Sequence, residues 1–183
     1  MRTHAPEQIT QTTNGTVVGM PLPPFSLPAI VPDESGAREK VLTNETLRGR
    51  PHILFFYPKD ATCDCTVEAC EFRDAYAEFL ALEFAVIGVS RDSIGAHKKF
   101  IAAQKLPFPL ISDKERTLIE GLNLLVHTTM YGKPVTKVLR HTFVVDANGI
   151  VRHEFAKVKS LGHARQVLDW LREQEVNTEG YNG

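Results

Sequence analysis

The stretch ILFFYPKDATCDCTVEACEFRDAY, residues 53–76, passes from an apolar run through a short polar loop into a helical pattern. Residues 53–57 are continuously apolar and are followed by Pro58, which is typical of a strand buried on both faces of a sheet. Beyond the loop, apolar side chains recur at the spacing of one helix face: Cys65, Ala69, Phe72, Tyr76, Phe79 and Leu80. The stretch predicts a buried strand, a loop and a helix whose apolar stripe packs on the sheet.

Strands and helices continue to alternate after this unit. Residues 84–90 form a second apolar run, and a helix follows in which Asp92 or Ser93 can accept from the first free N–H groups. Residues 107–111 predict a short strand, and residues 112–122 predict a helix that starts at Ser112 or Asp113 and ends near Gly121. Residues 122–139 match no pattern clearly enough to be assigned.

The last third of the domain contains a hairpin and a helix. Residues 141–155 place two apolar runs on either side of the turn DANG, and residues 162–174 carry one apolar face of Ala164, Val167, Leu168 and Leu171. The predicted fold class is therefore α/β of the thioredoxin type, with a central mixed sheet flanked by helices on both faces. The domain is predicted over residues 17–175, with a flexible N-terminal tail (1–16) and a C-terminal tail (176–183).

Composition excludes several classes of function. The formal net charge of −1 provides no attraction for nucleic acid, and 43% hydrophobic with 23% charged residues is ordinary for a soluble protein. The polar first 16 residues lack the apolar core of a secretory signal, and no window approaches about 18 apolar residues in a row. We expect a cytoplasmic protein that binds neither nucleic acid nor membrane.

The three cysteines of the chain, at positions 63, 65 and 70, could form a disulfide staple, a metal site, a redox centre or part of the core. An odd count at low density makes a staple the weakest of these, because clustered thiols in a reducing compartment are more often catalytic or metal-binding. Cys65 is predicted in or next to the first turn of the helix, where free N–H groups and the helix dipole favour a thiolate. The alternative is that Cys65 is only a small core residue.

Pro58, Thr62 and Cys65 are spaced as P-x-x-x-T-x-x-C, which resembles the active-site motif of the peroxiredoxins. FFYPKD, CTVEACEFRDAY, GVSRDS, HKKF, LPFPLISD, MYGK, TFVVD and KVKSLGHARQVL occur in the order of the bacterioferritin comigratory protein, or PrxQ, subfamily. The resemblance covers about residues 17–174. It implies a thioredoxin fold and a thiol peroxidase that acts on hydrogen peroxide and organic hydroperoxides, is reduced by thioredoxin, is monomeric, and needs no metal or organic cofactor.

The resemblance also implies roles for particular residues. Cys65 aligns with the peroxidatic cysteine, whose thiolate attacks a hydroperoxide and becomes a sulfenic acid. Thr62 would position the peroxide, and Pro58 would shield the sulfur from bulk water. Arg140 aligns with the active-site arginine that stabilises the thiolate and the leaving oxygen. Glu68 aligns with a glutamate that supports this arginine, although most helix glutamates are simply solvated.

Cys70 occupies the position of the resolving cysteine in those subfamily members that have one five residues after the peroxidatic cysteine. In an intact helix the two Cα atoms would lie about 8.5 Å apart, beyond the limit of about 7 Å for a disulfide. We therefore expect residues 63–72 to be ordered when reduced and to unwind before a Cys65–Cys70 disulfide forms.

At Cys63 and Asp64 the chain departs from the family, which usually has proline and then glycine there. The carboxylate of Asp64 should oppose a thiolate at Cys65 and slow the reaction. Cys63 could act as an alternative resolving thiol through a strained C-x-C disulfide, or it could be incidental.

Other functions remain open from the sequence. The three thiols with His127 or His141 could bind copper or zinc, although the spacing lacks the paired C-x-x-C of zinc sites. A thioredoxin-like oxidoreductase would need C-x-x-C at the helix start, which is missing, and a non-catalytic redox sensor would use the same sulfur chemistry. The remaining histidines, such as His97 and His163, are predicted to be surface or packing residues.

Overall fold

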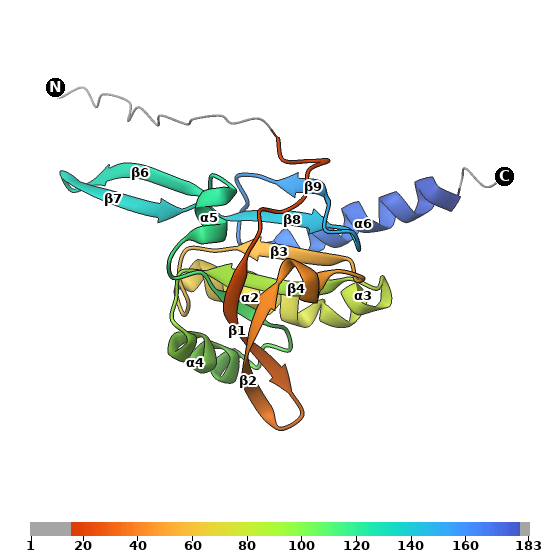
Figure 1. Cartoon of the computed structure of the whole chain (residues 1–183), viewed down its shortest axis with the longest axis horizontal. Helices are drawn as coiled ribbons and strands as arrows, with labels where there is room; N and C mark the ends of the chain where they lie inside the picture. The colour runs from red at the N-terminus through yellow and green to blue at the C-terminus, as the bar shows by residue number, and fades with distance from the viewer. Residues whose placement is uncertain (1–15, 180–183) are drawn as a thin grey trace.

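The computed structural model describes residues 16–179, with side chains through Glu175, and shows a seven-stranded sheet with helices on both faces (Figure 1). The strand order is β2-β1-β5-β4-β3-β8-β9. The strands are β1 Ser26–Asp33, β2 Gly36–Thr43, β3 His52–Phe56, β4 Ala85–Ser90, β5 Leu110–Ser112, β8 His141–Val145 and β9 Val151–Phe155. Except for Thr16 and the end of α6, the predicted tails (1–16 and 176–183) lie outside the described residues.

The sheet is mixed, as the sequence predicts. β3 pairs in parallel with β4, and β4 pairs in parallel with β5, whereas β1 and β8 join antiparallel. All five residues of β3 are buried, because the strand faces a hydrophobic core on each side. Ile53 and Phe55 belong to one core, and Leu54 and Phe56 belong to the other. This confirms the prediction of a strand buried on both faces.

The helices divide unequally between the two faces. They are α1 Asn44–Leu47, α2 Cys63–Asp74, α3 Tyr76–Ala81, α4 Ile94–Gln104, α5 Thr117–Gly121 and α6 His163–Glu179. Phe72 of α2, Phe100 of α4 and Leu168 of α6 share the core that contains Phe55. The opposite core is covered by α5 and by residues 17–25 before β1, the entry loop, which contributes Leu22 and Phe25. The catalytic candidates therefore lie on the helix-rich side of the sheet.

The predicted helix after residue 62 is interrupted at Ala75. This residue leaves the helical region (φ −92°, ψ 0°), so α2 ends there and α3 begins at Tyr76. Phe79 stays fully buried, but Leu80 is 39% exposed, so its prediction as part of the apolar stripe was wrong. A one-residue break divides the helix while leaving most of the apolar spacing intact, so periodicity alone does not reveal it.

Helix starts are only partly as predicted. Ser93 caps α4 by accepting from Ala96 N–H, which decides between the two candidates. The start predicted at Ser112 or Asp113 was wrong, because Ser112 belongs to β5 and α5 begins at Thr117. Asp113 still accepts from Ile119 N–H at 2.8 Å. Its carboxylate therefore satisfies an N–H group in the first turn of α5, although Asp113 lies outside the helix. The predicted end at Gly121 is confirmed.

Residues 122–139 form a second hairpin, β6 Leu125–Met130 and β7 Lys133–Val138, which projects from the body of the molecule (Figure 1). Its turn uses positive φ at Tyr131 and Gly132. Most of its side chains are partly or fully exposed on both faces, so no apolar face marks it in the sequence. β2 also lacks an apolar face that would mark it in the sequence, because it is exposed over nearly its whole length.

The hairpin and the helix predicted last are both confirmed. β8 and β9 pair across the DANG turn, in which Gly149 supplies the positive φ of 80°. The apolar face of α6 is buried. α6 continues to Glu179, into the stretch predicted as a C-terminal tail.

Candidate active site

The loop after β3 leads directly into α2 and positions the first candidate residues. Pro58 and Thr62 are exposed, and Ala61 between them adopts a positive φ of 58°. Thr62 is the N-cap residue of α2, but its hydroxyl donates to Lys59 O at 2.8 Å instead of capping the helix. The first N–H groups of α2 therefore have no side-chain cap from Thr62 and can stabilise an anion near Cys65, the third residue of the helix.

Cys65 is buried, with 2% of its surface exposed, and its sulfur is contacted by an arginine. Arg140 Nη2 donates to Cys65 Sγ at 3.3 Å. The two residues are far apart in sequence, and the register of the sheet brings them together. Phe56, at the end of β3, pairs with His141, at the start of β8. Arg140, the residue before β8, therefore lies beside the loop that leads to Cys65.

Glu68 lies one turn after Cys65 and completes this group. Its Oε2 accepts from Arg140 Nη1, and its side chain is fully buried. Burial raises the pKa of Glu68 to about 7, and the charge and hydrogen bond of Arg140 offset only part of this effect. Burial by itself would lower the pKa of Arg140, but Glu68 and then Cys65 raise it overall. The guanidinium therefore stays charged and held in place next to the sulfur.

A second buried polar network supports the loop from the other side. Tyr57 donates its hydroxyl to Asp60 Oδ1 at 2.6 Å, and Asp60 Oδ2 lies 2.6 Å from His97 Nδ1 on α4. His97 Nε2 lies 3.0 Å from Ile111 O. Both ring nitrogens of His97 thus face oxygen atoms. His97 is a buried side-chain partner of Asp60 rather than a surface residue.

The same network joins the ends of three parallel strands. Asp92, after β4, accepts from Asp60 N–H at 2.9 Å and from Ser90 Oγ at 2.6 Å. Ser112, at the end of β5, donates to Asp92 O at 2.6 Å. No sequence motif identified Asp60 or His97 as functional candidates. Asp60 lies within the FFYPKD motif, but its partner is 37 residues away.

The other two cysteines have different surroundings from Cys65. Cys70 is half-buried, and its Sγ donates to Gln104 Oε1 at 3.4 Å. Cys63 is exposed at the first position of α2, and all three cysteines are free thiols here. Asp64 is also exposed, and its Oδ1 accepts from Ser160 Oγ at 3.5 Å.

The metal-binding alternative requires His127 or His141 to lie with the three cysteines. His127 Nδ1 lies 3.1 Å from Thr136 Oγ1 within the β6–β7 hairpin, and His141 Nε2 lies 3.2 Å from Glu154 Oε2. Among the described residues, no group of three or more His, Cys, Asp or Glu side chains is arranged to hold a metal ion.

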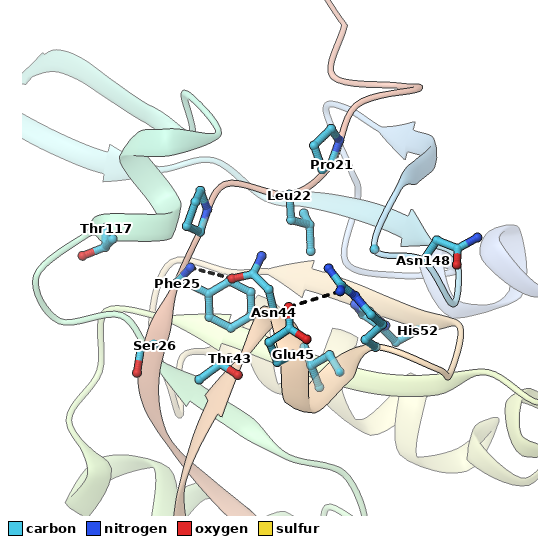
Figure 2. A pocket seen from close by; sticks show the side chains of 14 residues that line it. Pro21, Leu22, Phe25, Ser26, Thr43, Asn44, Glu45, His52, Thr117 and Asn148 are labelled. Carbon is cyan, nitrogen blue, oxygen red and sulfur yellow. Dashed lines mark hydrogen bonds and ion pairs between the residues drawn. The ribbon is translucent and has the colours of Figure 1, made fainter.

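A cavity of about 740 Å³ lies at the amino end of β3 (Figure 2). The candidate catalytic loop, residues 57–62, lies at the opposite end of this strand. The entry loop, α1 and the β8–β9 turn line it together with His52, whose pKa is lowered by burial. Phe25 N–H donates to Asn44 Oδ1 at 2.7 Å in its wall, and Glu45 pairs with Arg48. None of the predicted site residues is among those that line this cavity.

Comparison with known proteins decides the family. Residues 18–154 match the family described as AhpC/TSA. The chain belongs to the AhpC/TSA family. No helix among the described residues of this AhpC/TSA protein is long and apolar enough to cross a bilayer.

Curated relatives of the chain carry peroxiredoxin names. A putative peroxiredoxin bcp of Coxiella burnetii is 38% identical over 154 residues, which cover 84% of this chain and 97% of the relative. Peroxiredoxin Bcp of Bacillus subtilis is 39% identical over 126 residues, which cover 69% of this chain and 80% of the relative. These matches confirm the resemblance to the bacterioferritin comigratory protein subfamily.

Two solved structures that are similar to this chain belong to the same subfamily as the curated relatives. Peroxiredoxin Q of Xanthomonas campestris matches with a TM-score of 0.73 and 34% identity, over 81% of this chain and 90% of that one. A structure that concerns the alkyl peroxide reduction activity of the Xanthomonas campestris bacterioferritin comigratory protein also matches with a TM-score of 0.73, at 33% identity, over 82% of this chain and 91% of that one. The thioredoxin fold is thereby confirmed. The chain is a thiol peroxidase, an oxidoreductase that acts on hydroperoxides and is reduced by a thiol.

Proposed function

We propose that Cys65 is the peroxidatic cysteine of this AhpC/TSA protein and that Cys70 resolves its sulfenic acid. The observation that carries the proposal is the hydrogen bond from Arg140 to the buried sulfur of Cys65, in the first turn of a helix. A guanidinium and free helix N–H groups both favour a thiolate over a thiol. Neither Cys63 nor Cys70 combines burial, a contact with an arginine side chain and a first-turn position in this way.

In the first step the Cys65 thiolate attacks the terminal oxygen of a hydroperoxide. The S–O bond forms as the O–O bond breaks, the leaving alkoxide or hydroxide takes a proton, and Cys65 becomes a sulfenic acid. Arg140 stabilises the thiolate and then the charge that builds on the leaving oxygen. Glu68 holds Arg140 in position, Thr62 binds the peroxide through its hydroxyl, and Pro58 limits the access of water.

In the second step the sulfur of Cys70 attacks the sulfur of the sulfenic acid. The S–S bond forms, the S–O bond breaks, and the departing hydroxide takes up the thiol proton to leave as water. A dithiol then reduces the disulfide and is itself oxidised. We propose thioredoxin as this dithiol, and hydrogen peroxide and organic hydroperoxides as substrates. The alkyl peroxide reduction activity named for the Xanthomonas campestris relative supports the organic hydroperoxides.

A peroxidase assay coupled to thioredoxin and its NADPH-dependent reductase tests these roles. Cys65→Ser should lose all turnover. Cys70→Ser should still consume one equivalent of peroxide but should not turn over with thioredoxin. Cys63→Ser is the matched control, because it removes an exposed thiol two residues from Cys65. Mass mapping after one equivalent of peroxide should find a 65–70 disulfide, whereas a 63–65 disulfide, or loss of activity only in Cys63→Ser, would overturn the assignment.

We further propose that the protein acts as a monomer in the cytoplasm, with its domain over residues 17–175. The family match and the core contacts of α6 support these boundaries. Three free thiols, one of them exposed, suit a reducing compartment. Sedimentation of the reduced and the oxidised protein tests the monomer, and a dimer in both states would contradict it.

A further inference from the structure

The thiol of Cys70 lies where α2 meets the carboxyl end of α4, and one residue of α4 receives two hydrogen bonds from α2. Gln104, the last residue of α4, accepts from Cys70 Sγ through its side-chain Oε1 at 3.4 Å. The backbone oxygen of Gln104 accepts from Arg73 Nη1 at 2.7 Å. Arg73 follows Cys70 by three residues, so the two side chains lie on the same face of α2.

Both bonds come from the second half of α2, one at Cys70 and one beyond it at Arg73. A Cys65–Cys70 disulfide needs α2 to open, because five residues of helix separate the Cα atoms by about 8.5 Å, beyond the reach of a disulfide. Cys70 cannot leave its helical position without releasing Gln104 Oε1. Unwinding that continues to Arg73 must also release the carbonyl at the end of α4.

We propose that Gln104 and Arg73 are positioning residues that retain Cys70 in folded α2 and thereby set how fast the Cys65 sulfenic acid becomes a disulfide. This inference rests on the proposed roles of Cys65 and Cys70. If α2 opens in a pre-equilibrium, the rate of disulfide formation is proportional to the open population. Every bond that stabilises only the closed helix lowers that population.

The rate of this step decides between two fates of the sulfenic acid. Attack by Cys70 gives the disulfide and water. Attack on a second hydroperoxide by the same sulfur gives the sulfinic acid and water or an alcohol, which ends turnover unless a dedicated repair system acts. A tighter hold on Cys70 therefore favours sulfinic acid at high peroxide concentration, and a looser hold favours the disulfide.

The test compares Gln104→Ala with Lys99→Ala, a control that removes an exposed side chain from the same helix. The reduced protein is mixed with one equivalent of hydrogen peroxide, quenched at intervals with acid and a thiol-blocking reagent, and mapped by mass spectrometry. Loss of one hydrogen bond corresponds to about two- to five-fold in an equilibrium. We expect the 65–70 disulfide to form two- to five-fold faster in Gln104→Ala, with the rate of Cys65 oxidation unchanged.

Two further measurements separate positioning from general destabilisation. Hydrogen exchange of the reduced Gln104→Ala protein should be faster in α2 but unchanged in α6. At a hundred-fold excess of peroxide, less Cys65 sulfinic acid should accumulate than in the wild type. Arg73→Gln should change all three readouts in the same direction as Gln104→Ala.

The outcomes distinguish this inference from the proposed function. If the wild type forms the 65–70 disulfide and Gln104→Ala forms it at the same rate or more slowly, the positioning role is wrong and the proposed function stands. If the wild type forms no 65–70 disulfide, the role of Cys70 is wrong and the inference fails with it.

Discussion

Cys65 and Cys70 belong to one helix, but their surroundings differ in kind. Cys65 is buried at the helix start and is contacted by Arg140, which Glu68 holds in turn. Cys70 is half-buried, and its thiol donates to the amide of Gln104. The residue proposed to attack peroxide thus lies among charged groups held in place, whereas its proposed partner is held by contacts that can be released. This difference suits a chemical step that needs fixed geometry, followed by a step that needs movement.

The helix α4 shows the same difference along its length. His97 in its first half contacts the buried Asp60 of the catalytic loop through its ring, and Gln104 at its end accepts a hydrogen bond from Cys70. The two residues are seven positions apart, which puts them on one face of the helix. One helix therefore contacts both the fixed loop and the segment that we propose to open.

The largest expected effect comes from breaking the fixed contact of α4. His97→Gln removes the ring beside Asp60 Oδ2 and leaves Tyr57 as the side-chain donor to Asp60, and a buried charged group that loses a hydrogen-bond partner costs about 3 kcal/mol or more. Urea unfolding should show this loss in His97→Gln. Lys98→Gln, at an exposed neighbouring position, should unfold like the wild type. A loss below about 1 kcal/mol in His97→Gln would show that the network does not stabilise the loop.

Arg140→Gln should slow the oxidation of Cys65 by peroxide. Removing a charged donor aimed at the reacting atoms typically costs about 10²–10³-fold, or about 3–4 kcal/mol of transition-state stabilisation. Rapid mixing with hydrogen peroxide should show this decrease in the oxidation of Cys65. Arg165→Gln is the control, because Arg165 pairs with Glu78 in an exposed ion pair. Equal oxidation rates in Arg140→Gln and the wild type would remove Arg140 from the mechanism.

Glu68→Gln should show how the buried carboxyl group of Glu68 changes the free energy of unfolding with pH. The pKa of Glu68 in the folded protein is about 7, above the ordinary value of 4.5. Its contribution to stability is complete below pH 4.5 and is lost as the pH rises through 7. The free energy of unfolding of the wild type, relative to Glu68→Gln, should fall by about 3 kcal/mol between pH 4.5 and pH 7.5.

This comparison must be made as a difference between the two proteins. Burial lowers the pKa of His163 to about 4, so its contribution has the opposite sign and is lost as the pH falls below 6.5. Both proteins contain His163, so its effect cancels in the difference. A difference that does not change with pH would mean that Arg140 keeps Glu68 ionised throughout.

The smallest expected effect is at Asp64. The side chain is exposed near the first turn of α2, where solvent screens its charge. Asp64→Gly should raise the rate of Cys65 oxidation by about two- to five-fold at low ionic strength, and Asp64→Asn should reproduce most of the gain. Unchanged rates in both variants would show that this departure from the family pattern has no electrostatic effect on Cys65.

Sequence patterns predicted the parts of the fold that depend on neighbouring residues. The continuous apolar run of β3, the helical spacing after Thr62 and the DANG turn each act over a few positions. The exposed strand β2 and the β6–β7 hairpin were missed, because their side chains do not divide into a buried and an exposed face. The break at Ala75 was missed because it preserves most of the apolar spacing.

Some residues of the candidate site could likewise be predicted from the sequence, and others could not. The position of Cys65 at a helix start could be inferred from residues 53–76 alone, and family resemblance was needed to select Arg140 among the arginines. The family motif HKKF includes His97, but neither source gave a role to His97 or Gln104. These residues meet the catalytic loop and Cys70 across 37 and 34 positions of sequence. Such contacts leave no periodic signal in either segment.

The sequence by itself determined a strand, a loop and a helix with a cysteine at its start, because strand burial, proline and helix periodicity act locally. The tertiary structure decided what surrounds each thiol. The pairing of Phe56 with His141 sets Arg140 beside Cys65, and α4 brings Gln104 to Cys70. These surroundings depend on strand register and helix packing between distant segments, so only the folded chain distinguishes a fixed cysteine from a releasable one.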